Sequence, residues 1–379
     1  MDLAKLALDD AWLALLDAVA RAERLDLPPK RLAAEVRALS DAYNSGAFSR
    51  ARTRGALAAR LSFSFARDVP KSACAARELA WAGRLPSTLR VLDVGAGLGA
   101  STWGLARLLA QSGARGAIDA TFVDEDDAAL AIARAIADAK KREGDVDVRV
   151  STARAAGRGP FDVILVGQSL GEISDDVAAQ TAVLEDVLAR LDDRGSVVVI
   201  EPALAHRTRR LHRVRDALAA RGATIFAPCL HAAPCPMLEQ ERSWCHEDLP
   251  IDLPPRVAAI ARAAGLRWQG LTFSYLVLRK DGFTLPGALG EDARGAMRVV
   301  SLPIVTKGKR ELWLCGDAIA GEAADQERKL RKIARLDRDE EKRGAFSSAA
   351  RGDVIAFEPP LEPDAARAGK DVAVRIVKC

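Results

Sequence analysis

Apolar positions near the start of the chain recur with the spacing of amphipathic helices. Leu8, Trp12, Leu15 and Val19 stand three or four residues apart, so they share one face of a helix. Prolines interrupt the pattern at positions 28, 29 and 70, and helices usually end near such residues. Residues 1–85 are therefore predicted to form an all-helical N-terminal region.

From residue 86 to 280, short apolar runs alternate with longer amphipathic stretches. The runs are RVLDVG, ATFVD, VDVRVS, FDVILVG, GSVVVIE, ATIFA and LTFSYLVLRK. Strands separated by helices are typical of an α/β domain, in which helices cover a mostly parallel sheet. We expect a Rossmann-like, seven-stranded sheet in which residues 228–270 are inserted between the last two strands.

Residues 281–379 show a different pattern. Four strand-like pieces, MRVVSLPIV, ELWLC, DVIAFE and DVAVRIV, surround the charged segment QERKLRKIARLDRDEEKR, for which we predict a helix with stabilising charge pairs. A small, mainly β C-terminal domain is expected. We find no internal repeat and no low-complexity linker.

The run VLDVGAGLGAS ends the first strand of the α/β domain and opens a helix. Gly95, Gly97 and Gly99 allow the backbone to approach a ligand more closely than residues with a Cβ would. A nucleotide-type cofactor is implied. Its identity is open, because Gly95, Gly97 and Ala100 also satisfy the dinucleotide fingerprint of NAD-dependent oxidoreductases, and a purely structural turn is a third interpretation.

Three features favour S-adenosylmethionine over NAD. Asp93 lies two residues before the first glycine, where a carboxylate can meet the cationic amino acid end of this cofactor but would repel a pyrophosphate. Asp124 ends the next strand and can accept hydrogen bonds from ribose hydroxyls, although Glu125 could substitute. The last two strands would form an antiparallel pair resembling that of class I methyltransferases.

The carboxyl end of the fourth strand carries VGQSLGE, residues 166–172. Ligands bind at this edge of open α/β sheets, so we assign Gln168 to the cofactor site. Glu172 is a candidate for positioning a substrate or for capping a helix. The Asn-Pro-Pro-Tyr type motif of amine methyltransferases does not occur here, and we identify no catalytic base.

Composition narrows the class of protein. A length of 379 residues suits two or three domains, and no apolar run approaches the roughly 20 residues of a membrane-spanning helix. Acidic residues near the N-terminus are unusual for a targeting peptide, so we expect a cytoplasmic protein without a membrane partner. The net charge of +4 gives weak support to a polyanionic partner, and the sequence does not indicate an oligomeric state.

Three of the six cysteines, Cys229, Cys235 and Cys245, lie in the 228–270 insertion. Six cysteines are too few for a disulfide-stapled chain of this length, and their clustering points to metal ligation or chemistry. A fourth thiolate would complete a cubane iron-sulfur cluster, for which Cys315 is the best candidate. Cys74 and Cys379 are read as ordinary thiols.

Other interpretations of this cysteine group stay open. The three clustered cysteines could hold zinc together with His231 or His246, or could be unliganded buried thiols. A cysteine that follows proline could also act as the nucleophile of a pyrimidine-C5 RNA methyltransferase. Trp244 and Trp313 each lie close in sequence to a proposed ligand, and we expect them to pack over the cluster.

The segment AHRTRRLHRVRDALAARG is a candidate RNA-binding helix. Leu211, Val214 and Leu218 share one face, which would leave the arginines mostly toward solvent, where they could contact phosphates. These arginines are Arg207, Arg209, Arg210, Arg213 and Arg215. We expect recognition of folded RNA by shape and phosphate contacts, because the chain has only two tyrosines for base stacking.

Several motifs together resemble a known family over most of the chain. They are LSDAY at 39–43, VLDVGAGLG, LGE at 170–172, VVVIEPAL at 197–204, APC followed by CP at 235–236, WCH at 244–246 and FSYLVLRK at 273–280. The chain is similar in these motifs to the small-ribosomal-subunit methyltransferase-like assembly family of mitochondria and bacteria.

The resemblance implies a class I methyltransferase fold that associates with small-subunit ribosomal RNA during assembly. It also implies a 4Fe-4S cluster bound by Cys229, Cys235, Cys245 and Cys315. The chain departs from the family in reading Cys-Leu-His-Ala where Cys-Pro-His-Asp is common, and its C-terminal domain matches only loosely. Whether methyl transfer occurs does not follow from the fold, so a non-catalytic assembly factor is the main alternative.

Overall fold

The chain divides into two compact units. The computed structural model describes residues 3–46, 52–266, 270–316, 330–339, 344–362 and 364–377. The first unit comprises Met1–Asp176, Ala189–Glu201 and Leu249–Thr272, and the second comprises Val177–Leu188, Pro202–Asp248 and Phe273–Cys379. The three predicted domain boundaries stay a prediction, and each unit is described by itself below.

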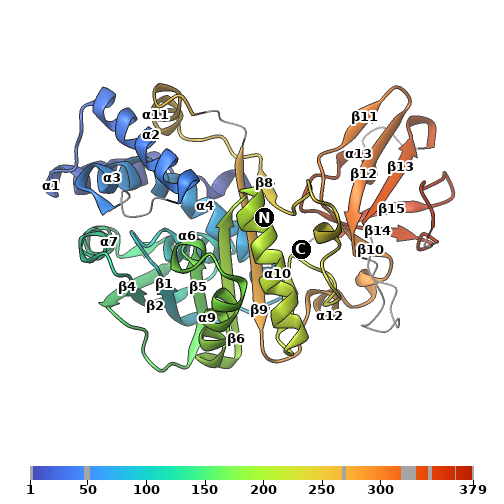
Figure 1. Cartoon of the computed structure of the whole chain (residues 1–379), viewed down its shortest axis with the longest axis horizontal. Coiled ribbons are helices and arrows are strands. Elements are labelled where there is room, and N and C mark those ends of the chain that lie inside the picture. The colour runs from blue at the N-terminus through green and yellow to red at the C-terminus, as the bar shows by residue number, and fades with distance from the viewer. Residues whose placement is uncertain are drawn as a thin grey trace. The chain divides into compact units, whose positions relative to one another are not determined.

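Strand order defines the fold of the larger sheet (Figure 1). Its strands are β1 (Thr88–Val94), β2 (Gly116–Val123), β3 (Arg142–Glu143), β4 (Val146–Ala153), β5 (Phe161–Gly167), β6 (Leu191–Pro202), β7 (Thr224–Ala227), β8 (Glu247–Leu249) and β9 (Leu271–Arg279). Within the described residues the order is β3-β4-β2-β1-β5-β6-β9-β7, with β8 paired to β9. Strands β4, β2, β1, β5 and β6 run parallel, whereas β7 is antiparallel to β9.

This order confirms the predicted fold class. Without the short strands β3 and β8, the seven predicted strands follow the order 3-2-1-4-5-7-6 with an antiparallel last pair, which is the class I methyltransferase arrangement. Strands β3 and β8 escape prediction because runs of two and three residues have no measurable periodicity. The parallel strands are rich in Val, Ile and Leu because helices cover both of their faces.

The N-terminal region is helical, as predicted. Its helices are α1 (Asp10–Ala22), α2 (Pro29–Ser45), α3 (Arg54–Ala59), α4 (Phe65–Ala75) and α5 (Arg77–Trp81). A π-helical turn, Arg60–Ser64, joins α3 to α4. The break predicted at Pro70 is wrong: this buried residue lies inside α4, where packing offsets the hydrogen bond that proline cannot make.

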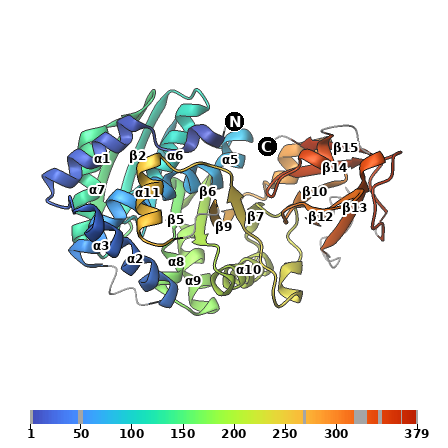
Figure 2. The same cartoon turned by 90° about the horizontal axis from the view of Figure 1, so that it is seen from above.

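Helices of the first unit pack on one another in pairs. Helix α4 contacts α6 (Ala100–Gln111), and both are labelled in Figure 1. Helix α1 contacts α7 (Asp127–Lys140), and α11 (Pro255–Ala263) contacts α2 (Figure 2). The N-terminal helices therefore lie against the helices that follow β1 and β2. The remaining helices among the described residues are α8 (Leu170–Ile173), α9 (Val177–Ala189), α10 (Ala205–Ala220), α12 (Leu285–Leu289) and α13 (Ala345–Ser348). No helix in the described ranges has the length and apolar character needed to cross a membrane.

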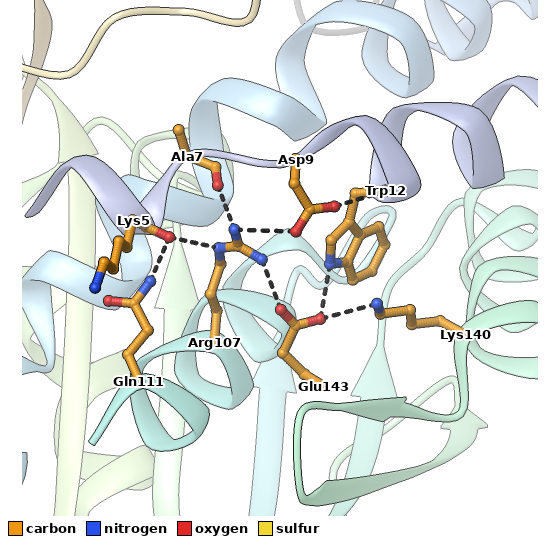
Figure 3. A network of polar contacts seen from close by, with 8 residues as sticks. All are labelled: Lys5, Ala7, Asp9, Trp12, Arg107, Gln111, Lys140 and Glu143. Atoms are coloured by element: carbon orange, nitrogen blue, oxygen red, sulfur yellow. Dashed lines mark hydrogen bonds and ion pairs between the residues drawn. The ribbon is translucent and has the colours of Figure 1, made fainter. Parts of the chain in front are cut away.

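A buried ion pair fastens the N-terminal segment to α6 and β3 (Figure 3). Arg107 Nη1 lies 2.6 Å from Glu143 Oε1, and both side chains are nine-tenths removed from solvent. The other carboxylate oxygen accepts a hydrogen bond from Trp12 Nε1 at 2.7 Å and lies 3.1 Å from Lys140 Nζ. Arg107 also donates through Nε to the Lys5 carbonyl at 3.1 Å, so one guanidinium binds both a carboxylate and the N-terminal backbone.

The second unit contains an antiparallel sheet, shown in orange to red in Figure 1. Its strands are β10 (Ala296–Val299), β11 (Ile304–Thr306), β12 (Lys309–Cys315), β13 (Arg331–Leu336), β14 (Val354–Glu358) and β15 (Ala373–Val377). The order is β11-β12-β10-β14-β15, with β13 paired to β12. Residues such as Met297, Leu312, Ile333 and Phe357 form its core. The small, mainly β region predicted near the C-terminus is therefore present.

The helix predicted over residues 326–343 is wrong where the structure describes it. Arg331–Leu336 is strand β13, followed by a short 3-10 turn, while residues 326–329 and 340–343 lie outside the described residues. Alternate side chains of β13 are buried, which is the period of a strand. The charge spacing was misleading because Arg331 and Arg335 turn inward and donate to the carbonyls of Ala365 and Val372.

We predict that Glu143→Ala lowers the free energy of unfolding by about 3–5 kcal/mol, because Arg107 would keep a buried charge without its carboxylate. Urea-induced unfolding followed by circular dichroism measures the loss. The matched control is Asp119→Ala, which breaks an exposed pair with Arg149 in the same unit and should cost less than about 1 kcal/mol. Equal losses in the two variants would contradict a special role for the buried pair.

Candidate functional site

The glycine loop between β1 and α6 depends on backbone conformations that favour glycine. Gly95, Gly97 and Gly99 have φ values of +66°, +53° and +83°. A Cβ at Gly95 would collide with Ser169, and one at Gly99 would collide with the Phe122 ring. These two glycines are thus required for packing within the fold. At Gly97 a Cβ would meet only the end of the Arg60 side chain, so this position keeps the free approach that a ligand needs.

Asp93 is buried beside the loop with one oxygen unused. Its Oδ2 accepts hydrogen bonds from Thr102 Oγ1 at 2.8 Å and from Thr102 N at 3.3 Å, while Oδ1 has no hydrogen-bond partner among the described residues. Burial raises the pKa of Asp93 to about 7, against the two bonds from Thr102, and the charge of Asp124 adds to the rise. In this range the folded chain retains a proton on Asp93 that the unfolded chain releases. The contribution of Asp93 to the stability of the fold therefore falls as pH rises from 3.8 to about 7.

Asp124 holds the glycine loop in place. Its Oδ2 accepts from Gly97 N at 2.8 Å and its Oδ1 accepts from Asp126 N at 2.8 Å. Each oxygen keeps a second lone pair, so the carboxylate can still accept from ribose hydroxyls. Glu125, the alternative considered from the sequence, is exposed and pairs with Arg52 at 3.0 Å.

The segment after β5 borders the same loop. Gln168 has a φ of +60°, which is uncommon for a residue other than glycine, and its backbone N–H donates to the Ile200 carbonyl at 2.6 Å. Ser169 Oγ donates to the Val94 carbonyl at 2.8 Å, joining this segment to the end of β1. Glu172 is exposed on α8, while the backbone of Gly171 at the start of α8 donates to the buried Glu201 at 3.1 Å.

Two residues of the N-terminal helical region also lie at this site, although neither was predicted from the sequence. Arg60 lies over the loop, with Nη1 3.3 Å from Asp126 Oδ2. Tyr43 is half-buried, and loss of solvent around its hydroxyl raises its pKa to about 12; the charges of Arg60, Glu172, Asp68 and Asp124 also act on this hydroxyl. The only signal in the sequence was the LSDAY motif, in which Tyr43 is the last residue.

The four proposed ligand cysteines line one pocket of the second unit. Cys229, Cys235, Cys245 and Cys315 surround it together with His231 and His246. The Sγ of Cys315 lies 3.7 Å from His231 Nε2. The distant position of Cys315 in the sequence is therefore no obstacle, because β12 brings this residue to the insertion. Cys74 lies apart in the first unit, and Cys379 lies outside the described residues.

The thiols are electrostatically coupled. Burial raises the pKa of Cys245 to about 12, and the neighbouring Cys229 adds to the shift. Burial and the other thiols likewise raise the pKa values of Cys235 and Cys315. Across the described part of the chain, no three Cys, His, Asp or Glu residues form a group that could hold a metal ion. The four thiols thus share a pocket, and the pKa values of Cys235, Cys245 and Cys315 are raised there.

Two arginines of α10 hold the loop that carries these cysteines. Arg209 donates to the carbonyls of Met237, Leu238, Gln240 and Ser243 at 2.6–3.1 Å. Arg215 donates to the carbonyls of His231, Ala232 and Ala233. Both oxygens of Asp216 accept from the Cys235 backbone N–H at 3.1 Å. Helix α10 therefore positions an irregular segment whose carbonyls have few backbone partners.

These contacts correct the predicted RNA-binding face of α10. Arg207 and Arg215 are buried, Arg209 and Arg210 are half-buried, and Arg213 is exposed. Periodicity located the apolar stripe correctly but could not show where long side chains at its border end. The tryptophans behave differently from each other: Trp313 packs with Cys235, Cys245 and Cys315 as expected, whereas Trp244 donates to the Ala203 carbonyl and stacks on His246.

We predict that Arg215→Ala lowers the free energy of unfolding by about 3 kcal/mol, because three carbonyls lose their donor together. Hydrogen exchange of residues 231–235 should rise in the same variant. Arg213→Ala on the same helix is the control, since an exposed arginine should change stability by less than about 0.5 kcal/mol. Unchanged exchange in Arg215→Ala would show that the loop does not depend on this side chain.

Comparisons with known proteins agree with the resemblance noted in the sequence. The family model described as "Mitochondrial small ribosomal subunit Rsm22" matches residues 74–333. No curated protein matches the chain.

Similar solved structures include the [4+2]-cyclase SpnF, at 18% identity over 56% of this chain and 81% of that one with a TM-score of 0.35. A putative RNA methyltransferase from Pyrococcus horikoshii is 14% identical over 56% and 81% of the two chains, with a TM-score of 0.32. TrmK from M. capricolum, in complex with S-adenosyl-homocysteine, is 10% identical over 55% and 69%, with a TM-score of 0.30. Because the family model covers more than half of the sequence, the chain belongs to the Rsm22 family.

Proposed function

We propose that this protein is an S-adenosylmethionine-binding, methyltransferase-like factor of the small ribosomal subunit, with a 4Fe-4S cluster in its cysteine pocket. Membership of the Rsm22 family is the observation that carries the link to the small subunit. The class I strand order supports the methyl-donor cofactor, because classic dinucleotide-binding sheets have the order 3-2-1-4-5-6. The NAD-dependent alternative is correspondingly disfavoured.

The glycine loop fits the cofactor on several points. Asp93 offers a buried carboxylate oxygen without a partner among the described residues, which an ammonium group would satisfy. Asp124 would accept from the ribose, and Gly97 would allow the cofactor to contact the backbone. When bound, the cofactor supplies an electrophilic methyl group, while the chain orients it and excludes water. Gln168, at the edge of the same loop, would border the reacting end.

The cysteine pocket fits an iron-sulfur cluster by its donor set. Four thiols with softer character than oxygen ligands line it, and such donors select iron-sulfur clusters and zinc. Each thiolate of a cubane binds a different iron, so the four sulfurs need not approach one another as ligands of a single ion do. We therefore favour the cluster over zinc. Cys315 on β12 would join the antiparallel sheet to the insertion through it.

Small-subunit ribosomal RNA is the proposed partner, supported by the family alone. The buried arginines of α10 cannot supply its phosphate contacts, which would have to come from exposed groups such as Arg213.

A second function is a non-catalytic assembly factor that retains the cofactor pocket as a structural element. Because a class I methyltransferase fold does not by itself imply methyl transfer, this alternative stands beside the catalytic one.

The cofactor assignment predicts that the chain binds S-adenosyl-homocysteine. Binding should be tighter at about pH 8 than at about pH 6, because Asp93 is protonated below its pKa of about 7 and then cannot pair with the ligand's ammonium group. Isothermal titration calorimetry at both pH values measures this. Gly97→Val should abolish binding, since a branched side chain is strained at positive φ and fills the approach to the loop.

The Gly97→Val variant also separates the two functions. If it cannot bind the cofactor but restores small-subunit assembly in cells that lack the protein, the catalytic interpretation fails. The unmodified chain should show no binding of NAD in the same calorimeter. NAD binding in place of S-adenosyl-homocysteine would refute the proposed cofactor.

The cluster assignment predicts that anaerobically purified protein is brown and contains iron and sulfide. Cys235→Ser should remove the colour and lower the melting temperature, because one iron would lose its thiolate. Cys74→Ser is the matched control: it removes a buried thiol outside the pocket and should keep the colour. A colourless, equally stable unmodified chain with stoichiometric zinc would refute the cluster.

A further inference from the structure

Arg60 reaches the glycine loop from an unusual element. It opens the π-helical turn Arg60–Ser64, which interrupts the helix formed by α3 and α4. Single π-helical turns inside α-helices often mark functional sites. Here the turn directs Arg60 to Gly97, where its Nη2 occupies the space that a Cβ would take. The N-terminal helices thus contribute a cation to the loop that β1 and α6 form.

The guanidinium of Arg60 has spare hydrogen-bonding capacity. Its only hydrogen bond in the described part of the chain runs from Nη1 to Asp126 Oδ2, at the long distance of 3.3 Å. Arg60 has five N–H donors, yet its side chain is only 17% exposed. Asp126 is itself occupied, because its Oδ1 accepts from the backbone of Ala128 and Ala129 at the start of α7. A largely buried arginine with one weak bond is suited to bind a further anion.

The loop has a negative group at one place and a positive group at another, and this pair indicates which kind of anion Arg60 binds. Asp93 supplies a negative group at the end of β1, and Arg60 supplies a positive group over Gly97. An amino acid group carries one ammonium and one carboxylate, and therefore complements this pair. The planar fork of arginine matches a carboxylate with two parallel hydrogen bonds.

We propose that Arg60 is the ligand of the carboxylate at the amino acid end of the bound cofactor. This inference rests on the proposed methyl-donor function and adds a positioning residue from outside the methyltransferase sheet. It implies that α3 and α4 are part of the cofactor site. The binding affinity of adenosine derivatives that lack the amino acid group should then not depend on Arg60.

The test compares two ligands that differ at this group. S-adenosyl-homocysteine has the amino acid end, whereas 5′-methylthioadenosine lacks it. Calorimetry on full-length Arg60→Ala should show roughly 10–100-fold weaker binding of S-adenosyl-homocysteine, as expected for loss of charge-assisted hydrogen bonds. Binding of 5′-methylthioadenosine should stay unchanged. Arg60→Lys, which keeps the charge but not the fork, should bind S-adenosyl-homocysteine with intermediate affinity.

Arg52→Ala is the matched control, because it breaks an exposed pair with Glu125, the residue next to Asp126, and should leave both affinities unchanged. Equal weakening of both ligands in Arg60→Ala would overturn the proposal, since Arg60 would then act by shaping the loop. Undiminished S-adenosyl-homocysteine binding in this variant would overturn the proposal but leave the cofactor assignment intact. Failure of the unmodified chain to bind either ligand would overturn both.

Discussion

Carbonyl oxygens in irregular backbone need donors, and this chain supplies many of them from buried and half-buried arginines. Arg209 and Arg215 serve the cysteine-bearing loop, and Arg107 serves the N-terminal segment. In the antiparallel sheet, Arg298 donates to the carbonyls of Pro228 and Gly352. Leaving a buried carbonyl without a donor costs about as much free energy as a lost hydrogen bond. Each of these guanidinium groups therefore takes the place of the backbone N–H that a strand or helix would provide.

This use of arginine also bears on how the basic residues of the composition are interpreted. The chain has 56 lysines and arginines but a net charge of only +4. A basic helix that directly follows the EPAL segment suggests a phosphate-binding surface. In α10 much of the charge is instead directed at the protein's own backbone, because Arg209 and Arg215 make seven contacts with carbonyls between them. The number of exposed cations is accordingly smaller than the sequence suggests.

The parallel sheet and the glycine loop were predictable because their signals are local. Apolar runs such as FDVILVG have the length of buried strands, and glycines at fixed spacing after a strand mark a ligand loop. Strand β13 was not predictable, since its alternation is made by Arg331 and Arg335, which count as polar in any pattern. Arg60 and Tyr43 were missed for another reason. They lie in the N-terminal helical region, and their place beside the loop depends on tertiary packing such as that of α2 on α3 and of α4 on α6, which no local pattern encodes.

The loop that carries the cysteines is held by contacts that do not involve the thiols themselves. Small zinc modules fold only with their metal because nothing else holds their loops. Here Arg209, Arg215 and Asp216 hold the backbone around Cys235 without using a thiol. The raised pKa values of Cys235, Cys245 and Cys315 mean that these three thiols hold their protons near neutral pH, which avoids repulsion among thiolates. Ligation must then release protons, which makes loading of the pocket more favourable as pH rises. Because Arg209, Arg215 and Asp216 hold this loop without a thiol, loss of the proposed cluster would remove a crosslink while the α10 contacts remain.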